Sequence, residues 1–153
     1  MAETQVFKVA PARRLAMAFN TLVYAGVGTF WAVTSTGNLS AVFAGLLFLL
    51  ALWAGLMLIR RRNVAEIGSD AVTVFGIWGQ RTEIPFAALQ GHTLEAGRRM
   101  GVLFWARPGQ TNEAFTPVSQ RMMGDDAAAA FRAALLARVP GLPSRLEQDG
   151  VAA

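Results

Sequence analysis

The side chains able to do acid–base or nucleophilic chemistry are few and scattered along this 153-residue chain. His92 is the only histidine, and no Ser or Thr lies in a context typical of a hydrolase nucleophile. A lone imidazole of this kind is most simply a surface residue of a strand. The chain has no cysteine, which excludes disulfides, thiolate metal sites and thiol nucleophiles. The sequence therefore predicts no catalytic residue and a protein that is not an enzyme.

Metal and cofactor binding also lack a recognisable ligand set. The carboxylates of the second half occupy separate turn and strand positions: Glu66, Asp70, Glu83, Glu95 and Glu113. Asp125 and Asp126 are adjacent, but their place before a helical pattern favours a role at a helix N-terminus. The glycines at 26 and 28 lie within an apolar run, not in a phosphate-binding loop. We therefore expect no metal and no cofactor.

Two uncharged apolar runs, residues 15–33 and 41–59, determine the expected architecture. As helices with a rise of about 1.5 Å per residue, each approaches the ~30 Å thickness of a bilayer core. Arginines flank the outer ends of the runs, whereas the connecting residues 34–40 carry no charge. Because positive residues stay on the cytoplasmic side, we expect both ends to be cytoplasmic and residues 34–40 to form a periplasmic loop.

A cleavable signal peptide is the rival interpretation of the first run. Its nineteen uncharged residues exceed the usual signal core of about 7–15 residues, and a second run follows almost at once. We therefore favour two retained transmembrane helices. Thirteen arginines against one lysine, with abundant Ala and Gly, are typical of a GC-rich bacterial genome. The expected location is accordingly a bacterial inner membrane.

Small residues recur four positions apart in both runs and favour close approach of two helices in lipid. They form the sets Thr21, Ala25 and Thr29; Gly28, Ala32 and Thr36; Ala41 and Gly45; and Ala51 and Gly55. The two most polar side chains of the first run, Asn20 and Tyr24, share one helical face. An amide within a membrane normally seeks a hydrogen-bond partner. Packing of the two helices on each other is the simplest interpretation, and contact with a larger membrane partner is the alternative.

The positive charge of the chain belongs to the membrane edge. Residues 1–62 carry a net charge of +5, whereas residues 63–153 carry −1. Nucleic acid is therefore disfavoured as a partner. The candidate contacts with a membrane surface or another anion are Arg13, Arg14, Arg60, Arg61, Arg62, Arg81, Arg98 and Arg99. For the last three, which fall in predicted turns, simple solvation of loop charges is the alternative.

Residues 63–140 change to short β-prone runs separated by turn residues, and this pattern predicts a cytoplasmic domain after a cytoplasmic segment 1–14. The expected strands are 64–68, 71–75, 82–84, 90–94, 101–106 and 113–118. A helix is expected from Asp125 to Arg138, where apolar residues form one stripe, and Pro140 ends it. We expect residues 141–153 to form a flexible tail.

Several motifs of the second half resemble those of a known group of bacterial membrane proteins. They are DAVTV at 70–74, the turn GQR at 79–81, EIPFAAL at 83–89, the strand at 102–106 and the helix at 125–138. In that group the third motif carries tryptophan and isoleucine where this chain has Phe86 and Leu89. The chain thus resembles proteins that have two transmembrane helices followed by a pleckstrin-homology-like (PH-like) domain.

The resemblance implies a membrane α-helical hairpin plus an α+β domain, a small antiparallel PH-like β-barrel or sandwich capped by one C-terminal helix. It also implies a non-enzymatic interaction or assembly module at the cytoplasmic face of the membrane. An anionic-lipid head-group sensor and an accessory subunit of a larger membrane complex are the alternatives. The expected partners are the lipid bilayer and either a membrane protein or a second copy.

Overall fold

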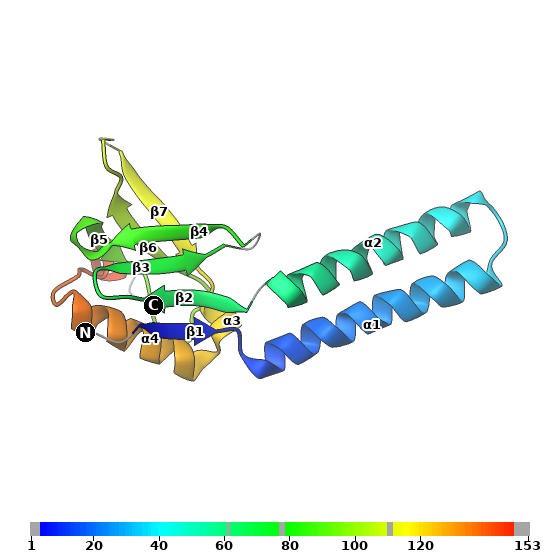
Figure 1. Ribbon diagram of the computed structural model, residues 1–153, viewed down its shortest axis with the longest axis horizontal. Helices are drawn as coiled ribbons and strands as arrows, with labels where there is room; N and C mark the ends of the chain where they lie inside the picture. The colour runs from blue at the N-terminus through cyan, green and yellow to red at the C-terminus, as the bar shows by residue number, and fades with distance from the viewer. Residues whose placement is uncertain (1–3, 61, 77–78, 110–111, 149–153) are drawn as a thin grey trace. The chain divides into compact units, whose positions relative to one another are not determined.

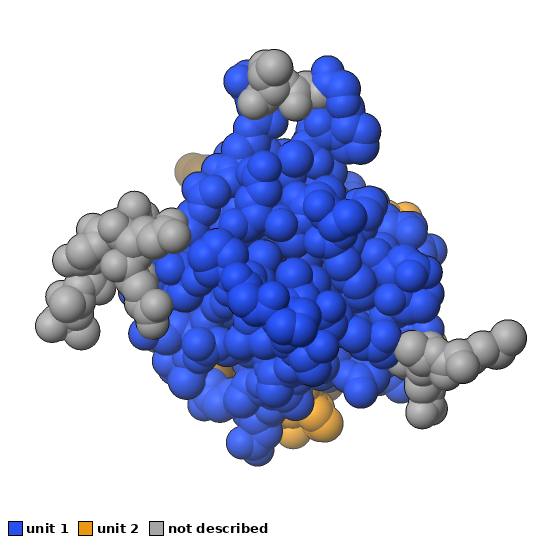
Figure 2. All heavy atoms as spheres, turned by 90° about the vertical axis from the view of Figure 1, so that its left-hand side faces the viewer, with its two compact units in different colours: residues 1–9, 63–153 blue, residues 10–62 orange. Residues whose placement is uncertain are grey.

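The computed structural model describes residues 4–60, 62–76, 79–109 and 112–148. The chain divides into two compact units, which Figure 2 distinguishes by colour. One unit consists of residues 10–62 and is a helical hairpin. The other combines residues 1–9 with residues 63–153 and contains the strands. The sheet-forming unit is therefore discontinuous in sequence, with the hairpin inserted near its N-terminus.

The hairpin consists of α1 (Pro11–Thr34) and α2 (Asn38–Arg60) (Figure 1). Proline suits the first turn of α1 because its missing N–H would have no helical acceptor there. Both helices are long and apolar enough to cross a membrane. They contain the predicted spans 15–33 and 41–59, and α1 begins earlier because Arg13 and Arg14 are also helical.

Small residues lie where the two helices meet. The Cα of Gly28 faces α2 so closely that an added Cβ would lie 3.2 Å from Cβ of Leu47. Further along, a Cβ on Gly55 would lie 3.7 Å from Cγ2 of Thr21. Ala41 and Gly45, in contrast, are exposed. Some of the predicted small-residue sets therefore form the helix–helix contact, whereas the Ala41–Gly45 pair lies outside it.

The first sheet has four antiparallel strands in the order β1-β2-β3-β4. They are β1 (Gln5–Lys8), β2 (Asn63–Ile67), β3 (Ala71–Phe75) and β4 (Arg81–Pro85). The sequence alone did not predict β1. Its last residue, Lys8, lies opposite Asn63, the first residue of β2. The hairpin insertion therefore leaves and re-enters the sheet at the same end of one strand pair.

The second sheet has three antiparallel strands in the order β5-β6-β7. They are β5 (Leu89–His92), β6 (Gly101–Ala106) and β7 (Glu113–Val118). Both sheets are open, so the barrel form of the expected fold is wrong. The antiparallel sheets and the helices that follow them agree with the expected α+β class. Pro85, which has no N–H to donate, ends β4, and a 3₁₀ turn (Phe86–Ala88) follows before β5. These residues interrupt the ladder between the sheets.

Two helices follow β7: α3 (Gln120–Met123) and α4 (Asp125–Arg138). The predicted bounds of α4 are confirmed. Its Phe131 and Leu135 are fully buried, and the ring of Phe131 meets that of Phe7 from β1 edge-on at 5.2 Å. Figure 1 shows α4 lying beside β1. The N-terminal strand therefore contributes to the same core as the C-terminal helix.

The C-terminal segment up to residue 148 is structured, in contrast to the expected flexible tail 141–153. Leu142 is buried, Ser144 forms a bridge to β5, and α5 (Arg145–Gln148) follows. The guanidinium of Arg145 stacks on the ring of Phe104 at 4.4 Å and pairs with Glu113. Aromatic and ionic contacts thus hold residues 142–148 in place, although the polar composition of this segment did not predict an ordered structure. Residues 149–153 lie outside the described residues.

Candidate interaction groove

The arginines of the hairpin lie where its two outer ends were expected. Arg13 and Arg14 belong to the first turn of α1, Arg60 ends α2, and Arg62 follows it. All four are exposed. The structure thus places four of the predicted contacts near one end of the antiparallel helix pair. Arg61 lies outside the described residues.

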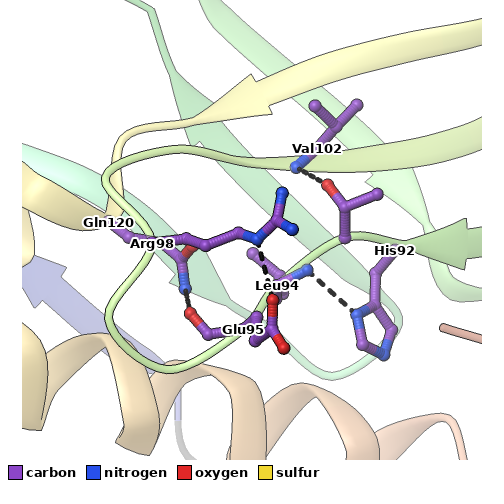
Figure 3. A network of polar contacts seen from close by, with 7 residues as sticks. His92, Leu94, Glu95, Arg98, Val102 and Gln120 are labelled. Carbon is purple, nitrogen blue, oxygen red and sulfur yellow. Dashed lines mark hydrogen bonds and ion pairs between the residues drawn. The ribbon is translucent and has the colours of Figure 1, made fainter. Parts of the chain in front are cut away.

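Of the other three candidate arginines, Arg81 lies on β4 and Arg98 and Arg99 lie in the loop between β5 and β6; two of the three pair with carboxylates. Arg81, on β4, lies 3.6 Å from Glu83, and both side chains are 62% exposed. Glu66 and Asp70 line the same shallow depression as this pair. Arg98, in the loop between β5 and β6, donates to Glu95 at 2.7 Å (Figure 3). Arg99 follows it and is exposed. Neighbouring carboxylates therefore reduce the net charge that Arg81 and Arg98 offer to an anion.

His92 is buried, so its interpretation as a surface residue of a strand was wrong. Only 2% of its surface is exposed, and its Nδ1 accepts a hydrogen bond from the backbone N–H of Leu94 at 3.1 Å (Figure 3). Its own backbone N–H donates to the carbonyl of Pro143. The C-terminal segment therefore covers this part of β5. No cluster able to hold a metal ion occurs within the described ranges.

A groove of about 390 Å³ lies between the end of the β3–β4 pair and the β6–β7 pair. From the first sheet it is lined by Val74, Gly76, Gln80 and Thr82, and from the second by Trp105, Arg107, Phe115, Thr116 and Pro117. It exists because the two sheets do not close into a barrel. The gap between the two open sheets therefore leaves a cleft with Trp105 on one wall and with Phe115 and Pro117 of β7 at its edge.

Trp105 forms the fixed part of this wall. Its side chain is 7% exposed, and its Nε1–H donates to Oγ1 of Thr116 on the neighbouring strand at 3.0 Å. The guanidinium carbon of Arg107 lies 5.6 Å from the tryptophan ring centroid, a cation–π distance. Across the part of the chain that the structure describes, Arg107 has no ion pair. The groove thus presents a positioned cation over an apolar wall.

Phe115 and Pro117 form the rim of the groove on β7. Phe115 is 73% exposed, an unusual position for a large aromatic side chain. β7 pairs with β6 alone and is an edge strand of its sheet. Pro117 suits such an edge because it has no N–H to offer the ladder. An edge strand beside an exposed aromatic ring can accept an extended peptide as an additional strand.

Sequence reasoning did not identify this groove, although part of its signal was present. The strand 101–106 was interpreted as core, and the alternation in β6 confirms that Trp105 faces inward. The position of Pro117 within a β-prone run marks an edge strand, which makes the neighbouring Phe115 a candidate contact. The opposing wall comes from β3 and β4, and only the spatial arrangement of the two sheets brings it there.

Comparisons of the chain with protein-family models, with curated proteins and with solved structures found no match. The functional conclusion therefore depends on the geometry of the two units.

Proposed function

We propose that this chain is a membrane-anchored, non-enzymatic interaction module that presents a PH-like domain at the cytoplasmic face of a bacterial inner membrane. The groove between the open sheets carries the proposal, because it joins an exposed aromatic side chain, a cation with no ion pair among the described residues and an edge strand. Neither catalytic residues nor a cofactor are part of the proposed role.

The exposure pattern of the hairpin supports its role as the membrane anchor. Its surface displays large apolar side chains such as Leu22, Phe30 and Leu52, each more than 60% exposed. A helix in the core of a soluble protein would bury most of its surface, whereas most residues of α1 and α2 are exposed. Removal of α1 as a signal peptide would also remove β1 from the first sheet, which argues for retention.

The pairing of β1 with β2 supports an arrangement with both helix ends on one side of the membrane. Val9 and Ala10 alone separate β1 from α1, and residues 61–62 alone separate α2 from β2. Lys8 and Asn63 are ladder partners, so the start of α1 and the end of α2 connect to neighbouring residues. With the exposed arginines at these ends, the positive-inside rule favours the cytoplasm.

The strand order supports the PH-like assignment. The unit has two antiparallel sheets followed by the helix α4, and a series of antiparallel strands closed by one C-terminal helix is the order that the PH-like resemblance implies. In this arrangement the hairpin is an insertion between the first two strands. The openness of the sheets is a departure from a closed barrel and creates the groove.

The proposed ligand of the groove is an extended segment of a membrane-protein partner. Such a segment would add to the free edge of β7 and place an apolar side chain against Trp105, while the neighbouring side chains of the segment would lie on the opposite face of the sheet, beside Phe115. Arg107 would favour a segment with a carboxylate beside that apolar residue. A cytoplasmic loop or terminus of a larger membrane complex has the required reach, so an accessory-subunit role is one form of the same proposal.

Site-specific photo-crosslinking of the full chain in native membranes tests this proposal. Replacement of Phe115 by p-benzoylphenylalanine should give a discrete protein adduct that mass spectrometry can identify. The matched control is the same replacement at Met100, which is 56% exposed in the loop between β5 and β6. Adding Arg107→Glu should reduce the Phe115 adduct about tenfold, because it reverses the charge offered to the partner.

Three results would contradict the groove assignment: no adduct from position 115, equal adducts from both positions, or no response to Arg107→Glu. If Arg107→Glu had no effect, the contact at Phe115 would be apolar only, and the proposed preference for a carboxylate would be wrong.

Anionic lipid is the second candidate ligand, favoured by the exposed arginines at the hairpin ends. Full-length protein in nanodiscs of zwitterionic lipid, with or without anionic lipid, separates the two roles. Lipid sensing predicts slower hydrogen exchange around residues 98–99 with anionic lipid, and loss of that protection in an Arg98→Gln, Arg99→Gln variant. Identical exchange in both lipids would exclude this alternative.

A further inference from the structure

A carboxamide without a partner lies on the outside of the hairpin. Asn20 is exposed on α1, and its side chain forms no hydrogen bond with any residue that the structure describes. It lies five residues beyond the start of the uncharged run at Leu15, about 7.5 Å further along the helix axis. A carboxamide has two N–H donors and an acceptor oxygen, and leaving them unmet in hydrocarbon is costly. A polar group from outside this hairpin would satisfy it.

Asn20 belongs to a seam with alternating spacings of three and four residues. The seam consists of Ala16, Asn20, Val23, Val27, Phe30 and Thr34. All six side chains are exposed and therefore face away from α2. Spacing of this kind is the 3.5-residue repeat by which two helices pack along a left-handed crossing. The seam is thus a second packing face of α1, separate from the one that meets α2.

We propose that two copies of this chain associate through this seam of α1, with the Asn20 carboxamides hydrogen-bonded to each other across a two-fold axis. The proposal rests on the membrane insertion described under the proposed function. In a two-fold interface each residue meets the same surface on its partner. One carboxamide can donate to the oxygen of the other, so this residue type is complementary to itself.

Membrane topology favours a second copy of this chain, and not an unrelated helix, as the partner of the seam. Copies inserted in the same direction share a two-fold axis normal to the bilayer, which places their Asn20 residues at the same depth. An unrelated partner would need its own polar group at that depth. A single Asn within an apolar repeat also fixes the register of two parallel helices, because any shift separates the two amides.

Energy transfer between labelled full-length chains in liposomes, measured over a dilution series in lipid, tests the association. Asn20→Leu should raise the dimer dissociation constant about 3- to 30-fold, the range of a side-chain hydrogen bond between membrane helices. Asn20→Gln keeps the donors and the acceptor and should restore most of the affinity. An equal loss in both variants, no change in Asn20→Leu, or a wild-type chain that is monomeric at every dilution would overturn the proposal.

Disulfide trapping locates the contact, because the natural chain has no cysteine. Val23→Cys should crosslink two copies under oxidation, since position 23 lies on the seam. Leu22→Cys is the matched control: residue 22 is 71% exposed on the same helix but is rotated by about 100° from position 23. Equal crosslinking at both positions would overturn the assigned face.

Alkaline extraction of the same membranes distinguishes this inference from the proposed function. Chain that remains in the membrane but does not associate contradicts the dimer alone. Chain that is released by alkali contradicts the membrane anchor and, with it, the dimer.

Discussion

The hairpin and the sheet unit bury opposite kinds of residue. Among the hairpin residues that the structure describes, four of the five buried positions are small (Gly28, Ala44, Ala51 and Ala54) and the fifth is Met57, whereas many large apolar side chains are exposed. In the sheet unit the largest fully buried side chains include Phe131, Ile67, Ile84, Leu94 and Leu103. The contrast agrees with the proposed insertion of the hairpin in a membrane and with a sheet unit that folds in water.

The physical reason is the driving force available to each unit. In water, burying large apolar side chains is favourable, so the sheet unit collects them in its core. In lipid there is no such gain between helices, and close backbone approach at small residues provides the packing instead. Asn20 is one exception to this pattern on the hairpin, and Phe115 is one on the sheet unit. Each exception marks a proposed contact surface.

The largest expected effect concerns the dependence of the sheet unit on β1. A chain that begins at Asn63 should fail to fold cooperatively, because it lacks β1, the buried Val9 and the ring that packs on Phe131. A matched chain in which residues 4–9 are joined to Asn63 by a short glycine-containing linker should fold. Near-ultraviolet circular dichroism and the dispersion of NMR amide signals measure the difference. Equal folding of both chains would show that the sheet unit does not need β1 in order to fold.

The second-largest expected effect is the loss of stability when the buried ring of Phe131 in α4 is removed. Phe131→Ala in the joined chain should lower the free energy of unfolding by about 3–5 kcal/mol, because Phe131 is fully buried. Urea unfolding provides the measurement. The control is Phe115→Ala, which removes an exposed ring and should change stability by about 0.5 kcal/mol or less. A large loss from the control would place Phe115 in the core and remove it from the groove.

Two glycines of α1, Gly28 and Gly26, test the packing of the helices in the hairpin. Gly28→Leu should separate the helices and destabilise the hairpin by about 1–3 kcal/mol, because a Cβ there already approaches Leu47 and the backbone of Ala44. Gly26→Leu should be tolerated, since nothing lies within 4 Å of a Cβ at that position. Titration of the full-length chain with denaturing detergent compares the two. Similar losses would contradict small-residue packing as the basis of the hairpin.

The smallest expected effect is at the C-terminal contact. Arg145→Gln should lower stability by about 0.5–1 kcal/mol through loss of the ion pair with Glu113 and the stacking on Phe104. Arg81→Gln serves as the comparison and should cause no measurable change, because its ion pair with Glu83 is longer and more exposed. Thermal unfolding at low and high salt checks both. No effect from Arg145→Gln would mean that Leu142 and the backbone contacts of Pro143 and Ser144 with β5 are enough to hold residues 142–148.

Local patterns predicted most of the elements correctly. The apolar runs predicted both helices, and the strand runs near 71–75, 101–106 and 113–118 match β3, β6 and β7. The N-terminal strand was missed because QVFK is only four residues long and its partner lies more than fifty residues away in sequence. Such a pairing leaves no local periodicity to detect. The sheets were not recognised as open for the same reason, since closure depends on distant strands.

The functional residues were harder to predict than the fold. The candidate arginines are visible in any sequence, but whether a guanidinium has a carboxylate neighbour depends on the fold, as the pairs Arg81–Glu83 and Arg98–Glu95 illustrate. The groove unites residues of β3, β4, β6 and β7, so no sequence window contains it. His92 was misjudged because its cover comes from the C-terminal segment around Pro143. Asn20, together with Tyr24, was apparent as a polar residue from the apolar run itself.

If the hairpin spans a membrane as proposed, its position between two paired strands couples the folding of the sheet unit to correct insertion of the helices. During translation β1 emerges first and remains an unpaired edge until both helices and β2 have been made. If the helices insert so that the two flanking strands are on opposite sides of the bilayer, Lys8 and Asn63 cannot meet, and the sheet stays incomplete. A folded sheet unit would therefore indicate correct insertion. A misinserted chain would expose an unpaired strand edge that quality-control proteases can recognise.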